Sequence, residues 1–183
     1  MARMPRVGRA ASILVLCLLA VSPLRATTFV PLSFEQLVNA SSTIVYGRVI
    51  EVRGQWSDDH RSIESVVTVD VLHGMKGSVP ERMAFTMPGG QVGRYVNVIP
   101  GTPVFAPGDM AVVFLTSRGA RLPIATGLTQ GVYRVQREGA SGDLRVVPPV
   151  IDTPGKILRG DPRRQPMALS AFEDSVKHAG GSR

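Results

Sequence analysis

The side chains that could act in catalysis or metal binding are few and scattered along this chain. It has three histidines, His60, His73 and His178, and one cysteine, Cys17. No two histidines stand at metal-ligand spacing, and a zinc site needs clustered cysteine, histidine or carboxylate ligands. We therefore expect no metal ion and no other cofactor.

The densest group of catalytic residue types is the run Asp58-Asp59-His60. Together with Asp109 and a serine from elsewhere, it is a candidate hydrolase site, because such sites are defined by geometry rather than by chain order. However, the sequence lacks a Gly-x-Ser-x-Gly nucleophile elbow, and residues 58–60 are typical of a solvated loop between strands. We predict that the chain is not an enzyme and keep a hydrolase as an alternative.

Two segments contain residue types suited to binding: 54–62, with Trp56, and 88–94, with Gly89, Gly90 and Arg94. The glycines do not predict a dinucleotide loop, because a strand rather than a helix follows them; we predict a wide hairpin loop. Tryptophan is enriched at binding hot spots, although Trp56 could instead cover one end of the core. We predict that the two loops meet at one end of a rigid β scaffold, with Trp56 as the anchor.

The elements that must position these residues are mostly strands. Alternating apolar runs predict strands over 43–53, 63–72, 83–87, 95–99, 110–115, 122–125, 131–136 and 144–147. Gly47 suggests a bulge or bend in the first strand, and residues 74–78 suggest a turn. Turn signals recur about every 8–12 residues, which predicts a mainly β fold, a small OB-like barrel or sandwich. The predicted core consists of Ile44, Val49, Val52, Val67, Val69, Val71, Phe85, Val112, Phe114 and Val132.

Two short peripheral helices complete the predicted architecture. The first covers about 33–40, with Ser33 and Gln36 in the positions of a capping box. The second covers 169–178, where Leu169, Phe172 and Val176 share one face. We expect a domain over 27–147, a proline-rich basic linker over 148–168, and a short helix and tail over 169–183.

Residues 1–26 have the pattern of a cleavable secretory signal: arginines first, an apolar run over 10–21, and a break that ends on Ala26. The apolar run is shorter than the roughly 20 residues needed to span a bilayer. We expect cleavage after Ala26, or alternatively near Ala20 or Ser22. We also expect no transmembrane segment after cleavage and a periplasmic or secreted location.

Cleavage changes both charge and redox chemistry. The net charge of +7 falls to +3, because Arg3, Arg6, Arg9 and Arg25 leave with the signal and no acid does. A charge of +3 is not the basic footprint of a nucleic-acid-binding protein. Cys17 also leaves, so no disulfide can form, and stability must come from a packed core.

One stretch resembles known proteins. "ASSTIVYGRVIEVRGQW", a charged loop, "VVTVDVLHGMKG" and "MAFTMPGG" resemble a type of uncharacterised bacterial exported protein and, loosely, the netrin-like barrel module found in tissue inhibitors of metalloproteinases. The resemblance covers under a third of the chain and implies an oligonucleotide/oligosaccharide-binding (OB) type of barrel. Those inhibitors grip the protease zinc through an amino-terminal cysteine. Here the expected first residue is Thr27, so the resemblance does not carry that mechanism.

Together these observations predict an exported, non-enzymatic binding or interaction module of the cell envelope or exterior. Its expected partner is an extracytoplasmic protein or glycan, and not a nucleic acid. The alternatives are the hydrolase described above and a protease-associated, inhibitor-like module.

Overall fold

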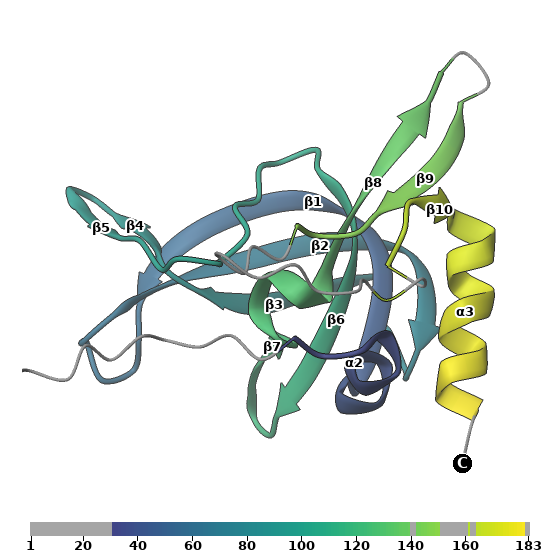
Figure 1. Ribbon diagram of the computed structural model, residues 1–183. Helices are drawn as coiled ribbons and strands as arrows, with labels where there is room; N and C mark the ends of the chain where they lie inside the picture. The colour runs from purple at the N-terminus through teal and green to yellow at the C-terminus, as the bar shows by residue number, and fades with distance from the viewer. Residues whose placement is uncertain (1–30, 140–141, 151–160, 162–163, 182–183) are drawn as a thin grey trace, which may run out of the picture. The chain divides into compact units, whose positions relative to one another are not determined.

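The computed structural model describes residues 31–139, 142–150, 161 and 164–181, all within the compact unit Pro31–Arg183. The predicted signal over 1–26 lies outside the described residues. The fold is mainly β with two helices, as predicted (Figure 1). Its elements are α2 (Phe34–Ala40), β1 (Thr43–Trp56), β2 (Ile63–Lys76), β3 (Arg82–Pro88), β4 (Gly90–Val92), β5 (Tyr95–Asn97), β6 (Met110–Arg118), β7 (Arg121–Ala125), the 3-10 helix η1 (Leu128–Gly131), β8 (Val132–Glu138), β9 (Asp143–Val147), β10 (Met167–Ala168) and α3 (Leu169–Gly181).

Five strands form a ring in the order β1-β2-β3-β7-β6, which closes because β6 also pairs with β1. All neighbours are antiparallel except β3 and β7, which meet in parallel at Thr86 and Ile124. The strands thus form a small barrel, and their number is that of an OB-type barrel. Strands β8, β9 and β10 extend the sheet beyond β6.

The long strand β1 can serve both sides of the ring because it bends. Its register with β2 shifts at three places, one of them between Tyr46 and Gly47. A Cβ at Gly47 would lie 2.7 Å from the carbonyl oxygen of Asp70. The predicted irregularity at Gly47 is therefore confirmed, and its cause is the close approach of the β2 backbone.

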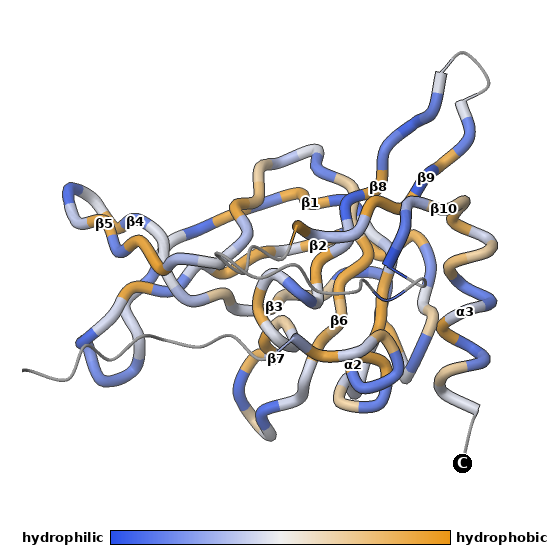
Figure 2. Tube along the Cα trace, in the orientation of Figure 1, coloured by the Kyte–Doolittle hydropathy of each residue, from blue (hydrophilic) through white to orange (hydrophobic). Residues whose placement is uncertain are grey.

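The first part of β1 and most of β6 are buried on both faces and separate two hydrophobic cores. Inside the ring lies the barrel core, made of Val45, Val49, Val67, Val69, Phe85, Met87, Phe105, Ala111, Val113, Leu115, Ala125 and Val132. On the outside lies the helix-covered face, made of Phe34, Leu37, Val38, Ile44, Tyr46, Val112, Phe114, Tyr133, Val135, Val146, Phe172, Val176 and Ala179. The predicted core residues all belong to these clusters, with Val52 and Val71 only partly buried. Figure 2 shows the apolar residues along β6 and the polar outer part of the β8–β9 hairpin.

The helix α2 is fixed by its own sequence and by a distant segment. The capping box is present: the Ser33 hydroxyl accepts from the Gln36 N–H, and the Gln36 side chain accepts from the Ser33 N–H. A carboxylate oxygen of Asp161 accepts from the Phe34 N–H at 2.9 Å, and Arg164 donates to the Leu32 carbonyl at 2.6 Å. Thus these two residues of the predicted 148–168 linker hold the start of the helix.

The structure corrects three local predictions. Strand β2 continues to Lys76, so the turn predicted at 74–78 begins only at Gly77. Residues 88–94 are not a wide loop, because Gly90–Val92 form strand β4, paired with β5. The segment 148–168 includes strand β10, whose Met167 and Ala168 pair with β9. In the first two cases backbone pairing outweighs the local preference of glycine for turns.

Candidate functional site

The candidate site is built around the β4–β5 hairpin, which lies over one end of the barrel. The turn places Gly93 (φ +55°) and Arg94 between the paired residues Val92 and Tyr95. A glycine in the first central position is the signature of a two-residue hairpin turn. The side chains of the hairpin alternate, so Gln91 and Val96 share one side while Val92 and Tyr95 share the other.

Glycines let the hairpin lie directly on the barrel strands. A Cβ at Gly54 in β1 would lie 1.9 Å from the carbonyl oxygen of Gln91, and one at Gly90 would lie 2.4 Å from the Ser65 hydroxyl. The neighbouring Gly89 has φ +88°, donates its N–H to Ile63, and accepts from the Ser65 hydroxyl at 2.8 Å. These close approaches and hydrogen bonds of the hairpin backbone hold it against β1 and β2.

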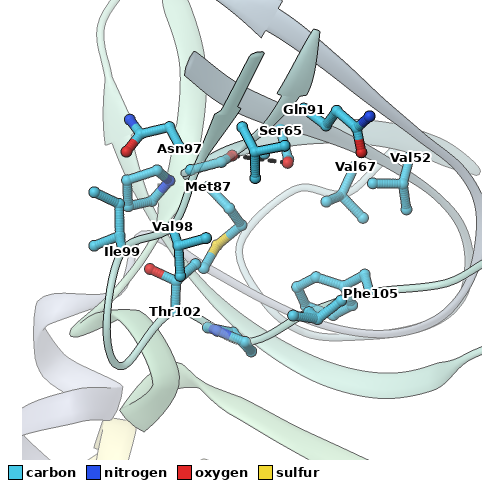
Figure 3. Close-up of a pocket in the computed structure, with 16 residues that line it drawn as sticks. Val52, Ser65, Val67, Met87, Gln91, Asn97, Val98, Ile99, Thr102 and Phe105 are labelled. Atoms are coloured by element: carbon cyan, nitrogen blue, oxygen red, sulfur yellow. Dashed lines mark hydrogen bonds between the residues drawn. The ribbon is translucent and has the colours of Figure 1, made fainter. Parts of the chain in front are cut away.

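Below the hairpin lies a cavity of about 270 Å³, here called the mouth pocket. Its floor is formed by side chains of the barrel core, among them Val67, Met87 and Phe105, and Figure 3 shows these side chains together with Val52. The wall opposite β2 is the segment 97–105. The lining residues are Val52, Ser65, Val67, Met87, Pro88, Gly89, Gly90, Gln91, Val96, Asn97, Val98, Ile99, Thr102, Pro103, Val104 and Phe105.

The rim of the mouth pocket is apolar and open to solvent. Val96, Val98 and Val104 are 61%, 79% and 83% exposed. Between Arg82 and Asp109 the sequence has a single charged residue, Arg94. Solvent-exposed apolar side chains gathered around a cavity are a frequent feature of binding surfaces.

An arginine on a neighbouring strand holds the far wall of the pocket in place. Arg134 of β8 forms an ion pair with Asp109 at 2.6 Å, donates to the Val104 carbonyl, and lies over the Phe105 ring at 4.9 Å from its centre. Asp109 also accepts from the Ala106 N–H. The Arg134 guanidinium therefore ties the loop between the pocket wall and β6 to the barrel, together with backbone hydrogen bonds of Gly108 and Asp109 with Val49 of β1.

The outer side of the hairpin carries a second feature, the aromatic patch, made of Trp56, Tyr95 and Arg94. The rings of Trp56 and Tyr95 meet edge to face at 5.6 Å, and both are partly exposed, by 38% and 52%. The Arg94 guanidinium lies over the Tyr95 ring at 5.3 Å. Among the described residues, no ion pair joins Arg94 to a carboxylate.

The residues predicted as an interaction surface thus lie around one hairpin. Gly89 and Gly90 line the mouth pocket, whereas Trp56 and Arg94 lie in the aromatic patch. Trp56 is the last residue of β1 rather than part of a loop. Sequence reasoning missed Tyr95 and the exposed valines, because 95–99 reads as an ordinary strand. The signal that could have found them is the long stretch with only one charge.

The three carboxylates of the alternative hydrolase site each have partners of their own. Asp58 pairs with Arg121 at 3.3 Å, and Asp109 is held by Arg134 as described. Asp59 accepts from the Ser57 hydroxyl and the Arg61 N–H, and these bonds lower the pKa of its carboxyl. Within the described ranges, no hydrogen bond or ion pair joins Asp109 to the 58–60 turn. His60 occupies a turn with φ +55°.

Two further searches concern the described residues only. They contain no group of three or more histidine, cysteine, aspartate or glutamate side chains placed to hold a metal ion. None of their helices is both long and apolar enough to cross a membrane. Comparison with known proteins gives no relative: no protein-family model, curated protein or solved structure matches the chain.

Proposed function

We propose that this chain is an exported, non-enzymatic binding module that recognises an extracytoplasmic partner through the β4–β5 hairpin. The observation that carries this proposal is the exposed rim of Val96, Val98 and Val104 around an uncharged pocket. Exposure of an apolar surface of this kind to water costs free energy, and this free energy is recovered when a partner covers the surface.

The aromatic patch supplies the second half of the proposed surface. Tryptophan, tyrosine and arginine are the residues most enriched at energetic hot spots of interfaces. In OB-type barrels the loop after the first strand and the loop between the last two strands carry binding. Here Trp56 is the last residue of β1, directly before the first of these loops, and the Asp58–Arg121 pair links that loop to the start of β7.

The test is capture of extracytoplasmic partners by the purified protein and by variants of the surface. We expect Trp56→Ala and Val98→Asp to reduce the recovered partner about 30-fold or more, because a hot-spot loss is worth about 2 kcal/mol. Leu72→Asp is the matched control, since Leu72 is a half-exposed apolar residue of β2 that does not line the mouth pocket.

Retention of the partner by both folded surface variants would overturn the proposal, as would equal loss in the Leu72→Asp control. The exported location has its own test. Intact mass of protein recovered from outside the cytoplasm should correspond to a chain that begins at Thr27, and a mass that retains Met1 would contradict it.

A further inference from the structure

We propose that the hairpin binds an extended, acidic segment of a partner polypeptide as an additional strand along β5, with one apolar side chain of that segment in the mouth pocket. The inference rests on the proposed function and specifies the chemistry of its partner. It depends on three features of the described residues: a free strand edge, a pocket beside that edge, and an unpaired positive charge at its end.

The free edge belongs to β5. Within the described residues this strand pairs only with β4, in a separate two-stranded sheet. In an antiparallel pair, hydrogen-bonded and non-hydrogen-bonded residue pairs alternate. Because Val92 and Tyr95 close the two-residue turn, the next pair is the open one, and the N–H and C=O of Val96 point to the outer edge. An extended peptide can pair with these groups, as in other complexes formed by strand addition.

The mouth pocket lies beside the same residue. The Val96 side chain lines the pocket while its backbone faces the free edge. A volume of about 270 Å³ exceeds the roughly 150 Å³ cavity that accommodates benzene, so a branched aliphatic or aromatic side chain fits. In strand addition, such pockets select alternate side chains while the backbone supplies the hydrogen bonds.

One polar atom in the pocket wall is not satisfied within the chain. The hydroxyl oxygen of Thr102 is buried and has no hydrogen-bond partner among the described residues. Buried hydroxyl groups are nearly always paired. A backbone group of an inserted segment is a suitable partner, since it reaches the wall together with the side chain that fills the pocket.

Charge complementarity selects an acidic segment. Arg94 is the only charged residue between Arg82 and Asp109, and it stands at the turn end of β5 without a carboxylate partner in the described ion pairs. A carboxylate of the added strand gains a charge-assisted hydrogen bond there. A basic segment would instead meet an uncompensated guanidinium group.

A small anionic amphiphile could also place its alkyl chain in the pocket and its carboxylate on Arg94. The free N–H and C=O of Val96 favour the peptide, because an alkyl chain makes no use of them. The difference is measurable: a peptide strand protects the Val96 amide from hydrogen exchange, whereas an alkyl carboxylate leaves it exposed.

The experiment uses a fluorescein-labelled peptide with the sequence Glu-Val-Glu-Leu-Glu-Val, followed by fluorescence anisotropy against the purified protein. Two matched peptides accompany it. One has lysine in place of glutamate, and the other has every backbone nitrogen methylated, so that it cannot donate backbone hydrogen bonds in either register. We expect binding of the acidic peptide to be at least 10-fold tighter than that of either matched peptide. Hydrogen exchange read by NMR should show protection of the Val96 amide.

Variants locate the binding on the hairpin. Val98→Asp and Arg94→Glu should each weaken the acidic peptide at least 10-fold. Their controls, Leu72→Asp on β2 and Arg137→Glu on β8, should leave it unchanged. Circular dichroism of each variant establishes that it is folded.

Three outcomes would overturn the inference: no binding of the acidic peptide at millimolar concentration, equal binding of the methylated peptide, or binding without protection of Val96. Binding of sodium octanoate in place of the peptide would assign the pocket to small amphiphiles. The proposed function is tested separately. If a captured partner depends on Trp56 and Val98 but the acidic peptide does not bind, the binding module is supported and only strand addition is contradicted.

Discussion

The apolar side chains of the helix-covered face are buried, whereas those at the rim of the mouth pocket are exposed to solvent. On the helix-covered face, Phe34, Phe114, Tyr133 and Phe172 are each at most 1% exposed, and their rings contact one another at 5.0–6.4 Å. At the mouth pocket, three valines stand mostly in solvent. Within the described residues, the two α-helices α2 and α3 both pack on the helix-covered face (Figure 1).

The difference separates a surface that the fold buries from one that, under the proposed function, a partner would cover. The covered face is sealed by side chains of α2, α3 and the sheet, so its contacts contribute to the free energy of folding. The hairpin contributes few buried side chains and is held by backbone contacts at Gly54 and Gly90. Substitutions on the first surface should therefore change stability, and substitutions on the second should change binding.

The largest expected effect tests this contrast directly. Phe172→Ala empties the centre of the aromatic cluster, where the Phe172 ring lies 5.0 Å from that of Tyr133 and 5.5 Å from that of Phe34. We expect the free energy of unfolding to fall by about 3–5 kcal/mol, the usual cost of removing a buried aromatic ring. Urea unfolding followed by circular dichroism measures it.

Val98→Ala is the counterpart at the mouth pocket. Because Val98 is 79% exposed, the expected change in the free energy of unfolding is within about 0.5 kcal/mol. Similar losses of unfolding free energy in Phe172→Ala and Val98→Ala would contradict the contrast, since they would mean that the rim valines already make contacts that stabilise the fold.

The second effect concerns how the hairpin is held. In Gly54→Ala, the new methyl group would fall 1.9 Å from the Gln91 carbonyl oxygen, so the hairpin must move away from β1. We expect a loss of about 1–3 kcal/mol, typical of overpacking, and NMR shift changes centred on β4 and β5. Gly181→Ala is the control, since nothing lies within 4 Å of its Cβ position. Shifts centred on the helix-covered face instead would contradict this assignment.

Much of the scaffold could be predicted because its signals are local. Alternation gave the long strands, and the capping box at Ser33 and Gln36 gave the start of α2. A barrel was predicted, but the pairing that closes the ring was not, since it depends on one strand, β1, that pairs with two partners. Likewise, no local signal shows that Asp161 and Arg164 fix α2 across more than a hundred residues.

The candidate site was harder to predict than the scaffold. Gly89, Gly90, Trp56 and Arg94 were identified from residue type, but as two loops. The fold of 88–97 into a hairpin over the barrel depends on close backbone approaches. Glycines permit such approaches, but a glycine in the sequence does not show which segment lies against it. Their role in binding stays a prediction, as do the signal peptide and the netrin-like resemblance.

The third effect concerns the wall of the mouth pocket. Arg134→Ala removes the ion pair with Asp109, the bond to the Val104 carbonyl and the contact with Phe105. We expect a loss of about 1–2 kcal/mol in the free energy of unfolding and faster hydrogen exchange across 102–109. Arg82→Ala is the matched control, because its pair with Asp70 is largely exposed and such pairs contribute about 0–1 kcal/mol. Unchanged exchange in Arg134→Ala would show that the wall is held by other contacts.

The fourth effect belongs to Tyr133→Phe, within the helix-covered face. The Tyr133 hydroxyl is buried and has no hydrogen-bond partner among the described residues. Removing an unpaired buried hydroxyl should change the free energy of unfolding by less than about 1 kcal/mol, toward greater stability. Urea unfolding at pH 8 measures this change, and Tyr95→Phe in the aromatic patch is the half-exposed control.

The same pair of variants separates the two regions at alkaline pH. Burial raises the pKa of Tyr133 to about 12, against the opposing effect of Arg164. The unfolded chain releases this proton near pH 10, while the folded chain keeps it. Titration of Tyr133 therefore leaves the free energy of unfolding unchanged below pH 10 and lowers it as the pH rises from 10 toward 12. Tyr133→Phe should lack this part of the alkaline loss, whereas Tyr95→Phe, which retains Tyr133, should keep it. Equal loss of stability between pH 8 and pH 11 in the two variants would show that the hydroxyl has a partner or access to water, and that the covered face is less completely sealed than the contacts of its rings indicate.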